Sequence, residues 1–166
     1  MSTLYVDNLQ PNLGSQVEIP DLKPLAGSVV QVKQSQTSAS LGTYVTTSFV
    51  DVGSGLQVVF TPLYATSKLL VTLHAQAYNT GSPNPYSAFT IFRDGVDQVS
   101  TSYGFGYMQV IDKDNASITS GNIYIDANST TQTVFTMGVR SNGTTGYTAN
   151  LNGNMQRSIT VMEIAQ

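Results

Sequence analysis

Apolar and polar side chains alternate along much of the chain after residue 28, most clearly over residues 68–78. One face of this stretch is apolar and carries Leu69, Val71, Leu73, Ala75 and Ala77. The other face is mixed and carries Leu70, Thr72, His74, Gln76 and Tyr78. Successive side chains of a strand point to opposite faces of a sheet, so this period of two predicts a β-strand with one face against a core.

Similar short runs follow one another between turns rich in Gly, Asn, Ser and Pro. The predicted strands cover residues 29–32, 44–52, 56–61, 68–78, 88–92, 96–100, 107–111, 121–126, 133–140 and 158–164, with Phe135, Met137 and Val139 pointing inward. Asp94-Gly95 predicts a tight hairpin, and long loops are expected at residues 79–86 and 141–154. Short strands that recur at a spacing of roughly 8–12 residues predict an all-β fold, an antiparallel β-sandwich that is jelly-roll-like.

The amino-acid composition also favours β-strands over helices. Val, Ile and Thr number 45, whereas Glu occurs twice and Lys four times. The β-branched side chains suit a pleated surface better than a helix because their χ1 rotation is restricted. Helix signals are therefore nearly absent from the chain.

Residues 1–26 have a different pattern and are expected to form an extended N-terminal arm, with residues 27–166 as the β-sandwich domain. Three of the six prolines lie here, at Pro11, Pro20 and Pro24, and each favours extended backbone. Apolar side chains nevertheless recur every few residues, which a solvated linker would not need. The candidate partner-binding residues of this arm are Leu4, Tyr5, Val6, Leu9, Leu13, Val17, Ile19, Leu22 and Leu25. We expect them to lie along a surface, either of the same domain or of a neighbour.

Charge excludes several classes of protein. Only 10% of the residues are charged and the net charge is −3, whereas Ser, Thr, Asn and Gln make up 61 of the 166 residues. Without a basic cluster we expect no nucleic-acid partner. No apolar run reaches the ~18 residues of a membrane span, so no membrane insertion is expected, and no secretory signal is recognisable. The absence of Cys excludes disulfides and thiolate sites.

Little of the chain suggests catalysis, so no enzyme, cofactor or metal site is expected. His74 is the sole histidine and lies on a polar strand face, where a sheet-surface or interface role is expected. Asp112-Lys113-Asp114-Asn115 lacks the frame of a calcium loop and predicts a turn. Gly104-Phe105-Gly106 lacks the context of a dinucleotide loop. Most Asp residues adjoin turn signals, which argues against the paired carboxylates of a glycan-cleaving enzyme.

Tyrosines are the remaining candidates for surface recognition. The segment from Tyr103 to Tyr107 alternates aromatics with glycine, and Tyr86 and Tyr147 lie in the two long predicted loops. Exposed aromatic faces between small polar residues are typical of adaptable binding loops. The alternative is that the aromatics of residues 103–107 fill the core and the glycines mark a bulge. The sequence is compatible with both interpretations.

The opening Ser2-Thr3-Leu4-Tyr5-Val6-Asp7-Asn8-Leu9-Gln10-Pro11-Asn12 resembles the start of virion structural proteins of marine tailed phages, cyanophages in particular. The body is similar to their β domains at Ser28-Val29-Val30-Gln31-Val32, Ser48-Phe49-Val50-Asp51-Val52-Gly53, Thr61-Pro62, Ser67-Lys68-Leu69-Leu70-Val71 and Phe92-Arg93-Asp94-Gly95. The resemblance implies a virion component with a jelly-roll-like head, commonly trimeric, tethered through its N-terminal arm. Fibre proteins of this kind usually carry a long shaft, whereas Ala26-Gly27 joins arm and head directly here.

These observations predict a non-enzymatic virion protein, assembled in the host cytoplasm. We expect a capsid decoration or knob protein whose arm binds a capsid or other virion protein. The alternative is a tail-fibre or receptor-binding tip that recognises host surface glycan through its tyrosines. One arm gains little net free energy on binding, because ordering its backbone offsets the burial of its apolar side chains. Tight attachment therefore requires several arms that bind together, which predicts a homo-oligomer. The resemblance favours a trimer.

Overall fold

Alternation over residues 68–78 produces the longest strand of the fold, β5 (Lys68–Thr80). The computed structural model describes residues 24–80, 86–99, 101–105, 107–109, 115–141, 148–151 and 155–166. The five residues predicted to face inward from β5, Leu69, Val71, Leu73, Ala75 and Ala77, are all completely buried. The predicted sidedness of β5 is therefore confirmed.

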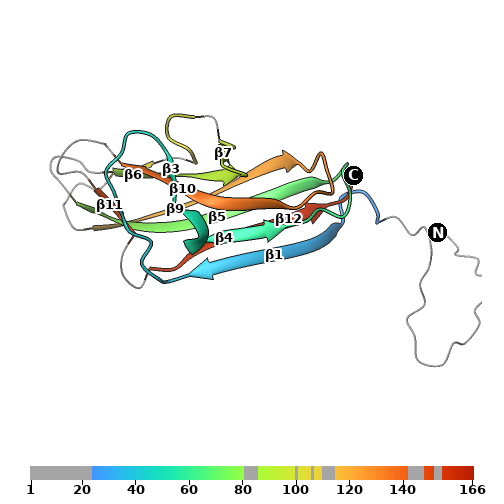
Figure 1. The fold of residues 1–166 in the computed structure, drawn as a ribbon, viewed down its shortest axis with the longest axis horizontal. Coiled ribbons are helices and arrows are strands. Elements are labelled where there is room, and N and C mark those ends of the chain that lie inside the picture. Colours follow the sequence, from blue (N-terminus) through green and yellow to red (C-terminus); the bar gives the residue numbers. More distant parts are fainter. Residues whose placement is uncertain are drawn as a thin grey trace, which may run out of the picture.

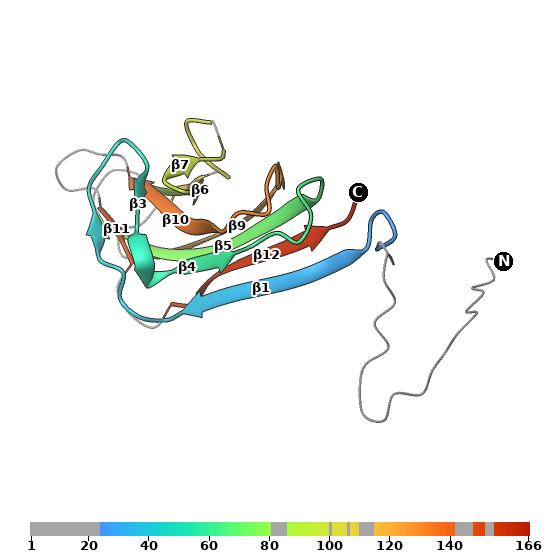
Figure 2. The same ribbon diagram turned by 45° about the vertical axis from the view of Figure 1, so that its right-hand side comes forward.

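The first sheet is built around β5 (Figure 1). On one side β5 pairs with β9 (Asn115–Asp126), and on the other with β12 (Arg157–Ile164), which in turn pairs with β1 (Val29–Thr37). Figure 2 shows β1, β12 and β5 side by side along the length of the molecule. Near the far end of β5, the short strand β11 (Thr148–Asn150) takes the place of β12 and pairs with β2 (Thr43–Tyr44).

The second sheet is built around β10 (Thr133–Ser141) and β6 (Tyr86–Arg93), which pair along most of their length. The other side of β10 pairs with β3 (Val50–Asp51) and β4 (Gln57–Phe60), with a 3-10 turn η1 (Gly53–Gly55) between them. The other side of β6 pairs with β7 (Val96–Asp97) and β8 (Tyr107–Gln109). Within the described ranges each sheet thus has four strand positions, some of them filled by two short strands.

The order of these positions defines a jelly roll. In chain order they are β1, β3/β4, β5, β6, β7/β8, β9, β10 and β12. The first sheet takes the first, eighth, third and sixth positions, and the second sheet takes the second, seventh, fourth and fifth. This interleaving of two antiparallel sheets is the double Greek key of a jelly roll. The predicted fold class is confirmed.

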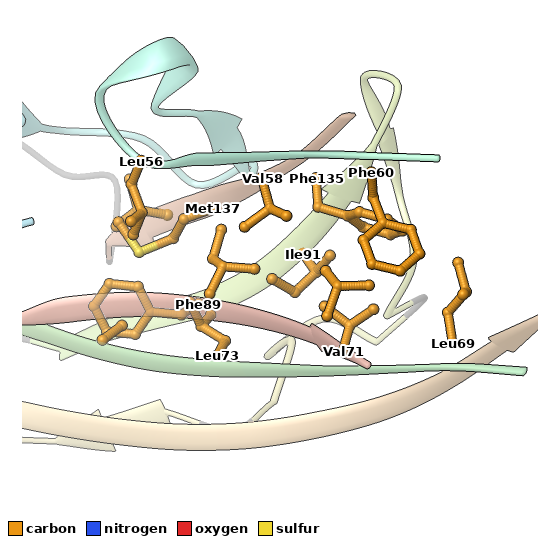
Figure 3. Close-up of a cluster of buried hydrophobic side chains, with 14 of the residues drawn as sticks. Leu56, Val58, Phe60, Leu69, Val71, Leu73, Phe89, Ile91, Phe135 and Met137 are labelled. Carbon is orange, nitrogen blue, oxygen red and sulfur yellow. The ribbon is translucent and has the colours of Figure 1, made fainter. Parts of the chain in front are cut away.

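The core lies between the two sheets. Leu56, Val58 and Phe60 point from β4 and its approach toward β5, as Figure 3 shows. Between these layers lie the inward side chains of β6 and β10: Phe89, Ile91, Phe135, Met137 and Val139. All five are completely buried, so the inward orientation predicted for Phe135, Met137 and Val139 is confirmed. At about 25 cal/mol per Å² of apolar surface, burial of this set is the main term that stabilises the sandwich.

Several predicted elements differ from the structure. The strand expected over residues 44–52 is present only as the two-residue strands β2 and β3. Between them the Thr46 hydroxyl donates to Ser48 O (2.8 Å) and accepts from Ser48 N (3.2 Å), a local alternative to strand pairing. Conversely, β1 continues through Ser35 to Thr37, and β9 begins six residues earlier than expected. Strand β11 lies within the long loop predicted over residues 141–154, where no strand was expected.

The predicted Asp94-Gly95 hairpin is confirmed between β6 and β7. Both residues have positive φ, +50° at Asp94 and +80° at Gly95. The Asp94 carboxylate also accepts hydrogen bonds from Thr133 Oγ1 (2.5 Å) and Val134 N (2.8 Å) at the start of β10. The turn is therefore held both by its backbone conformation and by its side chain.

Candidate functional site

Two regions at opposite ends of the sandwich carry the candidate residues. At one end Lys68 of β5 pairs with Ile164, next to the C-terminus, and at the other end Thr80 pairs with Thr148. Thirteen residues of strand separate these ends by about 40 Å. The chain enters the described part of the structure at the first end, beside the C-terminus (Figures 1 and 2).

The entry point, residues 24–28, is a hydrogen-bonded turn that we name the arm root. Leu25 O accepts hydrogen bonds from Ser28 N (2.9 Å) and Ser28 Oγ (2.6 Å), and Gly27 has φ +84°. Positive φ at the third residue of a four-residue turn favours glycine. Gly27 N donates to Ala165 O (2.8 Å), and Ala165 N donates to Ser28 O (3.0 Å). The point where the predicted arm meets the predicted domain is thus fixed against the C-terminal strand.

Leu25 is the one predicted arm residue that falls within the described part of the chain, and its side chain is 83% exposed. The other eight lie outside the described residues: Leu4, Tyr5, Val6, Leu9, Leu13, Val17, Ile19 and Leu22. Beside the arm root is a pocket of about 180 Å³. It is lined by Pro24, Tyr64, Thr66, Ser67, Ala165 and Gln166. A leucine that projects into solvent next to a small pocket suits contact with another polypeptide.

A buried carboxylate organises the loop behind this pocket. Glu163 of β12 is completely buried and accepts hydrogen bonds from Leu63 N (2.9 Å), Tyr64 N (2.9 Å) and Gln31 Nε2 (2.6 Å). Burial alone would raise the pKa of Glu163, but the hydrogen bonds outweigh it and hold the pKa below its ordinary value of 4.5. The charged form is therefore the one that fixes the loop, and this role is structural.

At the opposite end, three aromatic rings surround a guanidinium on the outer face of the second sheet. We name this set, Phe49, Tyr86, Tyr103 and Arg140, the Arg140 cluster. The Arg140 guanidinium carbon lies 5.6 Å from the ring centre of Phe49, 5.7 Å from that of Tyr86 and 5.3 Å from that of Tyr103. Arg140 Nη2 also donates to Tyr86 Oη (2.7 Å), and the two tyrosine rings meet edge to face at 6.2 Å. Such cation–π contacts stabilise a charge without an acidic partner.

Four separate segments meet in the Arg140 cluster. Tyr86 and Arg140 belong to β6 and β10, Phe49 precedes β3, and Tyr103 comes from the turn before β8. The turn lies close to β6 because residue 104 is glycine: a Cβ there would collide with the Phe89 carbonyl, and φ is +57°. Phe105 packs against the core, whereas Tyr103 remains 46% exposed. Glycine in this segment thus permits close packing rather than a bulge in a strand.

Two of the four tyrosines predicted for surface recognition, Tyr86 and Tyr103, therefore come together. Tyr107 begins β8, where its backbone pairs with Ala88. Tyr147 lies outside the described residues. Sequence reasoning missed Arg140 and Phe49. Arg140 could have been noticed as an arginine at the end of a strand whose other side chains are uncharged, but no sequence signal placed Phe49 beside it.

The other candidates have simpler surroundings. His74 lies on the outer face of the first sheet, where Nδ1 is 2.9 Å from Ser120 Oγ, which agrees with the expected sheet-surface role. Asp112, Lys113 and Asp114 lie outside the described residues. Within the described ranges, no three His, Cys, Asp or Glu side chains converge as metal ligands would. The same ranges contain no helix long and apolar enough to cross a membrane.

No protein-family model matches the chain, and no curated protein matches it. Among solved structures, the chain is similar to one in the structure of infectious bursal disease virus, Gx strain, with 12% identity and a TM-score of 0.36. That alignment covers 81% of this chain and 31% of the viral one, so the chain spans about a third of the viral chain's length. The strand order of the two sheets defines the jelly roll independently of this similarity.

Proposed function

We propose that this chain is a non-enzymatic structural protein of a phage virion, and more specifically a capsid decoration or knob protein anchored through residues 1–26. The observation that carries the proposal is the arrangement at the arm root. The chain enters the jelly roll beside the C-terminus with Leu25 83% exposed, about 40 Å from the loop end of the sandwich. A body attached at this end would present its loops and the Arg140 cluster outward.

The opening sequence supports the same proposal. It resembles the start of virion proteins of marine tailed phages, and its apolar side chains recur at spacings that suit a groove on a neighbouring polypeptide. Burying apolar surface stabilises the contact by about 25 cal/mol per Å², whereas ordering each residue of the arm costs about 1–2 kcal/mol. Attachment by several arms of one oligomer would overcome this cost, because the second and later arms bind at a high effective concentration.

Removing the arm tests the proposal directly. We expect a chain lacking residues 1–23 to keep the thermal unfolding midpoint of the full chain and to lose association with particles of the phage that encodes it. The measurement is co-sedimentation of the purified protein with particles lacking their own copy. An unfolded truncated chain, or one that still binds particles as tightly, would contradict the attachment role.

Point variants test whether the apolar side chains of the arm, and not merely its length, drive binding to the particle. Replacing Leu9 and Leu13 by Ser removes two apolar side chains from the arm, and we expect weaker particle binding with an unchanged unfolding midpoint. The matched control replaces Gln10 and Asn12 by Ser in the same segment, which we expect to leave binding unchanged. Equal losses in both variants would show that apolar contact does not drive the attachment.

A second candidate, recognition of host surface glycan by a tail-fibre or receptor-binding tip, is favoured by Tyr103. Its ring is 46% exposed and backed by the Arg140 guanidinium, an arrangement on which a sugar ring could stack. In a glycan-array measurement we expect Tyr103→Ala to abolish any specific signal of the full chain. Tyr78→Ala, which removes a 38% exposed tyrosine from the first sheet, is the control. No signal from the full chain, or the same loss in both variants, would rule out this candidate.

A further inference from the structure

The free edges of the two sheets differ in how they are protected. At the edge formed by β1 and β4, Gln31 Nε2 donates to Thr61 O (2.8 Å) and Lys33 Nζ donates to Val59 O (3.1 Å). These side chains occupy carbonyl groups that another strand would need, and β1 also has a register shift between Val29 and Gln31. Bulges and charged side chains are the usual means by which a monomer prevents edge-to-edge pairing.

Among the residues that the structure describes, strand β9 shows none of these protections. It pairs with β5 over twelve consecutive positions without a register shift, and it contains no Pro and no charged residue from Asn115 to Ile125. Within the described part of the chain, no other strand pairs with its outer edge. A long, regular, uncharged edge of this kind presents unpaired backbone N–H and C=O groups to a partner.

The exposed side chains of β9 are symmetric about Gly121. Ile118 and Tyr124 are 47% and 62% exposed, and each lies three residues from Gly121 on the outer face. Ser120 and Asn122 lie between them on the same face. The order along this face is therefore apolar, polar, polar, apolar, and it is the same in both directions.

We propose that β9 pairs antiparallel with β9 of a second copy about a two-fold axis at Gly121. In this register Tyr124 of each copy lies opposite Ile118 of the other, and Ser120 lies opposite Asn122. Cross-strand pairs of an aromatic and a β-branched side chain stabilise antiparallel sheets, and no like charges are brought together between residues 118 and 124. The same patch serves both copies, as a closed two-fold interface requires.

The surface beside β9 continues this contact. Across the first sheet, Tyr124 pairs with Leu70, Leu70 with Met162, and Met162 with Val32, which forms an apolar row on the outer face. In the paired sheet the partner's Ile118 extends this row by one more position. Pairing at β9 would therefore join the first sheets of the two copies into one continuous sheet. The edge at β9 would then no longer be free.

Engineered cysteines test the register, because the natural chain has no cysteine. Ser120→Cys and Asn122→Cys are prepared as separate full-length variants and oxidised alone or mixed. The proposal expects a disulfide-linked dimer in the mixture and little in either variant alone, because residue 120 lies opposite residue 122 and not opposite itself. Cα atoms of directly opposed residues in an antiparallel pair are about 4.5–5.5 Å apart, within disulfide range. Equal cross-linking in all three samples, or none, would overturn the proposed pairing.

Sedimentation equilibrium of the full chain gives an independent readout. We expect a mass that is an even multiple of 17.7 kDa. Ile118→Lys together with Tyr124→Lys places lysines opposite each other and should dissociate the pair, whereas Ile118→Glu together with Tyr124→Lys places opposite charges across the same interface and should restore it. A monomer or trimer of the natural chain, or equal dissociation by both double variants, would overturn the proposal.

Discussion

At the residue scale, the two buried charged side chains, Glu163 and Arg157, hold neighbouring backbone segments in place through hydrogen bonds. Glu163 holds the loop at the arm-root end, and Arg157 is the corresponding buried charge toward the other end of β12. Arg157 is completely buried, and its guanidinium donates to the backbone carbonyls of Gln76 (2.8 Å), Met155 (3.2 Å) and Ala39 (3.3 Å). Burial lowers the pKa of Arg157 from its ordinary value. Each charge thus fixes neighbouring backbone rather than forming an ion pair with the other.

Glu163 predicts a specific pH dependence of stability. Because its pKa is lower in the folded chain than the ordinary 4.5, the charged form contributes stability above pH 4.5, and this contribution is lost as the pH falls through the folded-state pKa. We expect Glu163→Gln to lower the free energy of unfolding by about 1–3 kcal/mol at neutral pH and to flatten its decrease in acid. Denaturant titrations across this pH range measure both effects.

The control for this prediction is Asp126→Asn. The Asp126 side chain is 57% exposed and forms an ion pair with Lys68 (2.5 Å), so its removal should cost little and leave the acid dependence in place. If the difference between Glu163→Gln and the natural chain is the same at neutral and acid pH, the charged carboxylate is not the source of the stability.

At the element scale, side-chain alternation predicted the buried strands well and the edge strands poorly. The pattern over residues 68–78 identified β5 because one face of that strand lies against the core. The first half of β9, from Asn115 to Ser120, carries no such pattern in its sequence, and its backbone pairing with β5 makes it a strand. The polar second half of β1 is similar: it pairs with β12 through Thr37.

The candidate residues likewise divide into those that a local sequence pattern predicts and those that only the folded chain brings together. The turn propensity of Asp94-Gly95 and the separate pattern of residues 1–26 are local properties that can be recognised in the sequence. The Arg140 cluster depends on contacts between residues far apart in the chain, such as Phe49 and Arg140, which no local pattern encodes. Tyr86 and Tyr103 were recognised from composition, but their contact follows from the pairing of β6 with its neighbours.

The hairpin between β6 and β7 gives a prediction at this scale. Asp94→Ala removes the acceptor for Thr133 Oγ1 and Val134 N and places alanine at φ +50°, so we expect a loss of about 1–3 kcal/mol in the free energy of unfolding. Asp94→Asn keeps an acceptor and tolerates positive φ, so it should retain much of this stability. Denaturant unfolding of the two variants measures the difference, and equal losses would show that the side-chain contacts of Asp94 contribute nothing.

At the scale of the whole molecule, the jelly roll separates two kinds of surface. One end holds the arm root, the C-terminus and a small pocket, and the other holds the Arg140 cluster. Strand β9 lies along one side, between these ends. A pair of copies joined at β9 would carry two arms, and because the two copies of β9 run antiparallel, the two arm roots would lie toward opposite ends of the joined sheet.

The most direct test of the attachment role is a reconstruction, by electron cryomicroscopy, of particles of the phage that encodes this chain. The proposal predicts density for the jelly roll on the particle surface, with residues 1–23 leading from the arm root to a different virion polypeptide. Density that returns those residues to their own jelly roll, or particles in which the chain is absent, would contradict it.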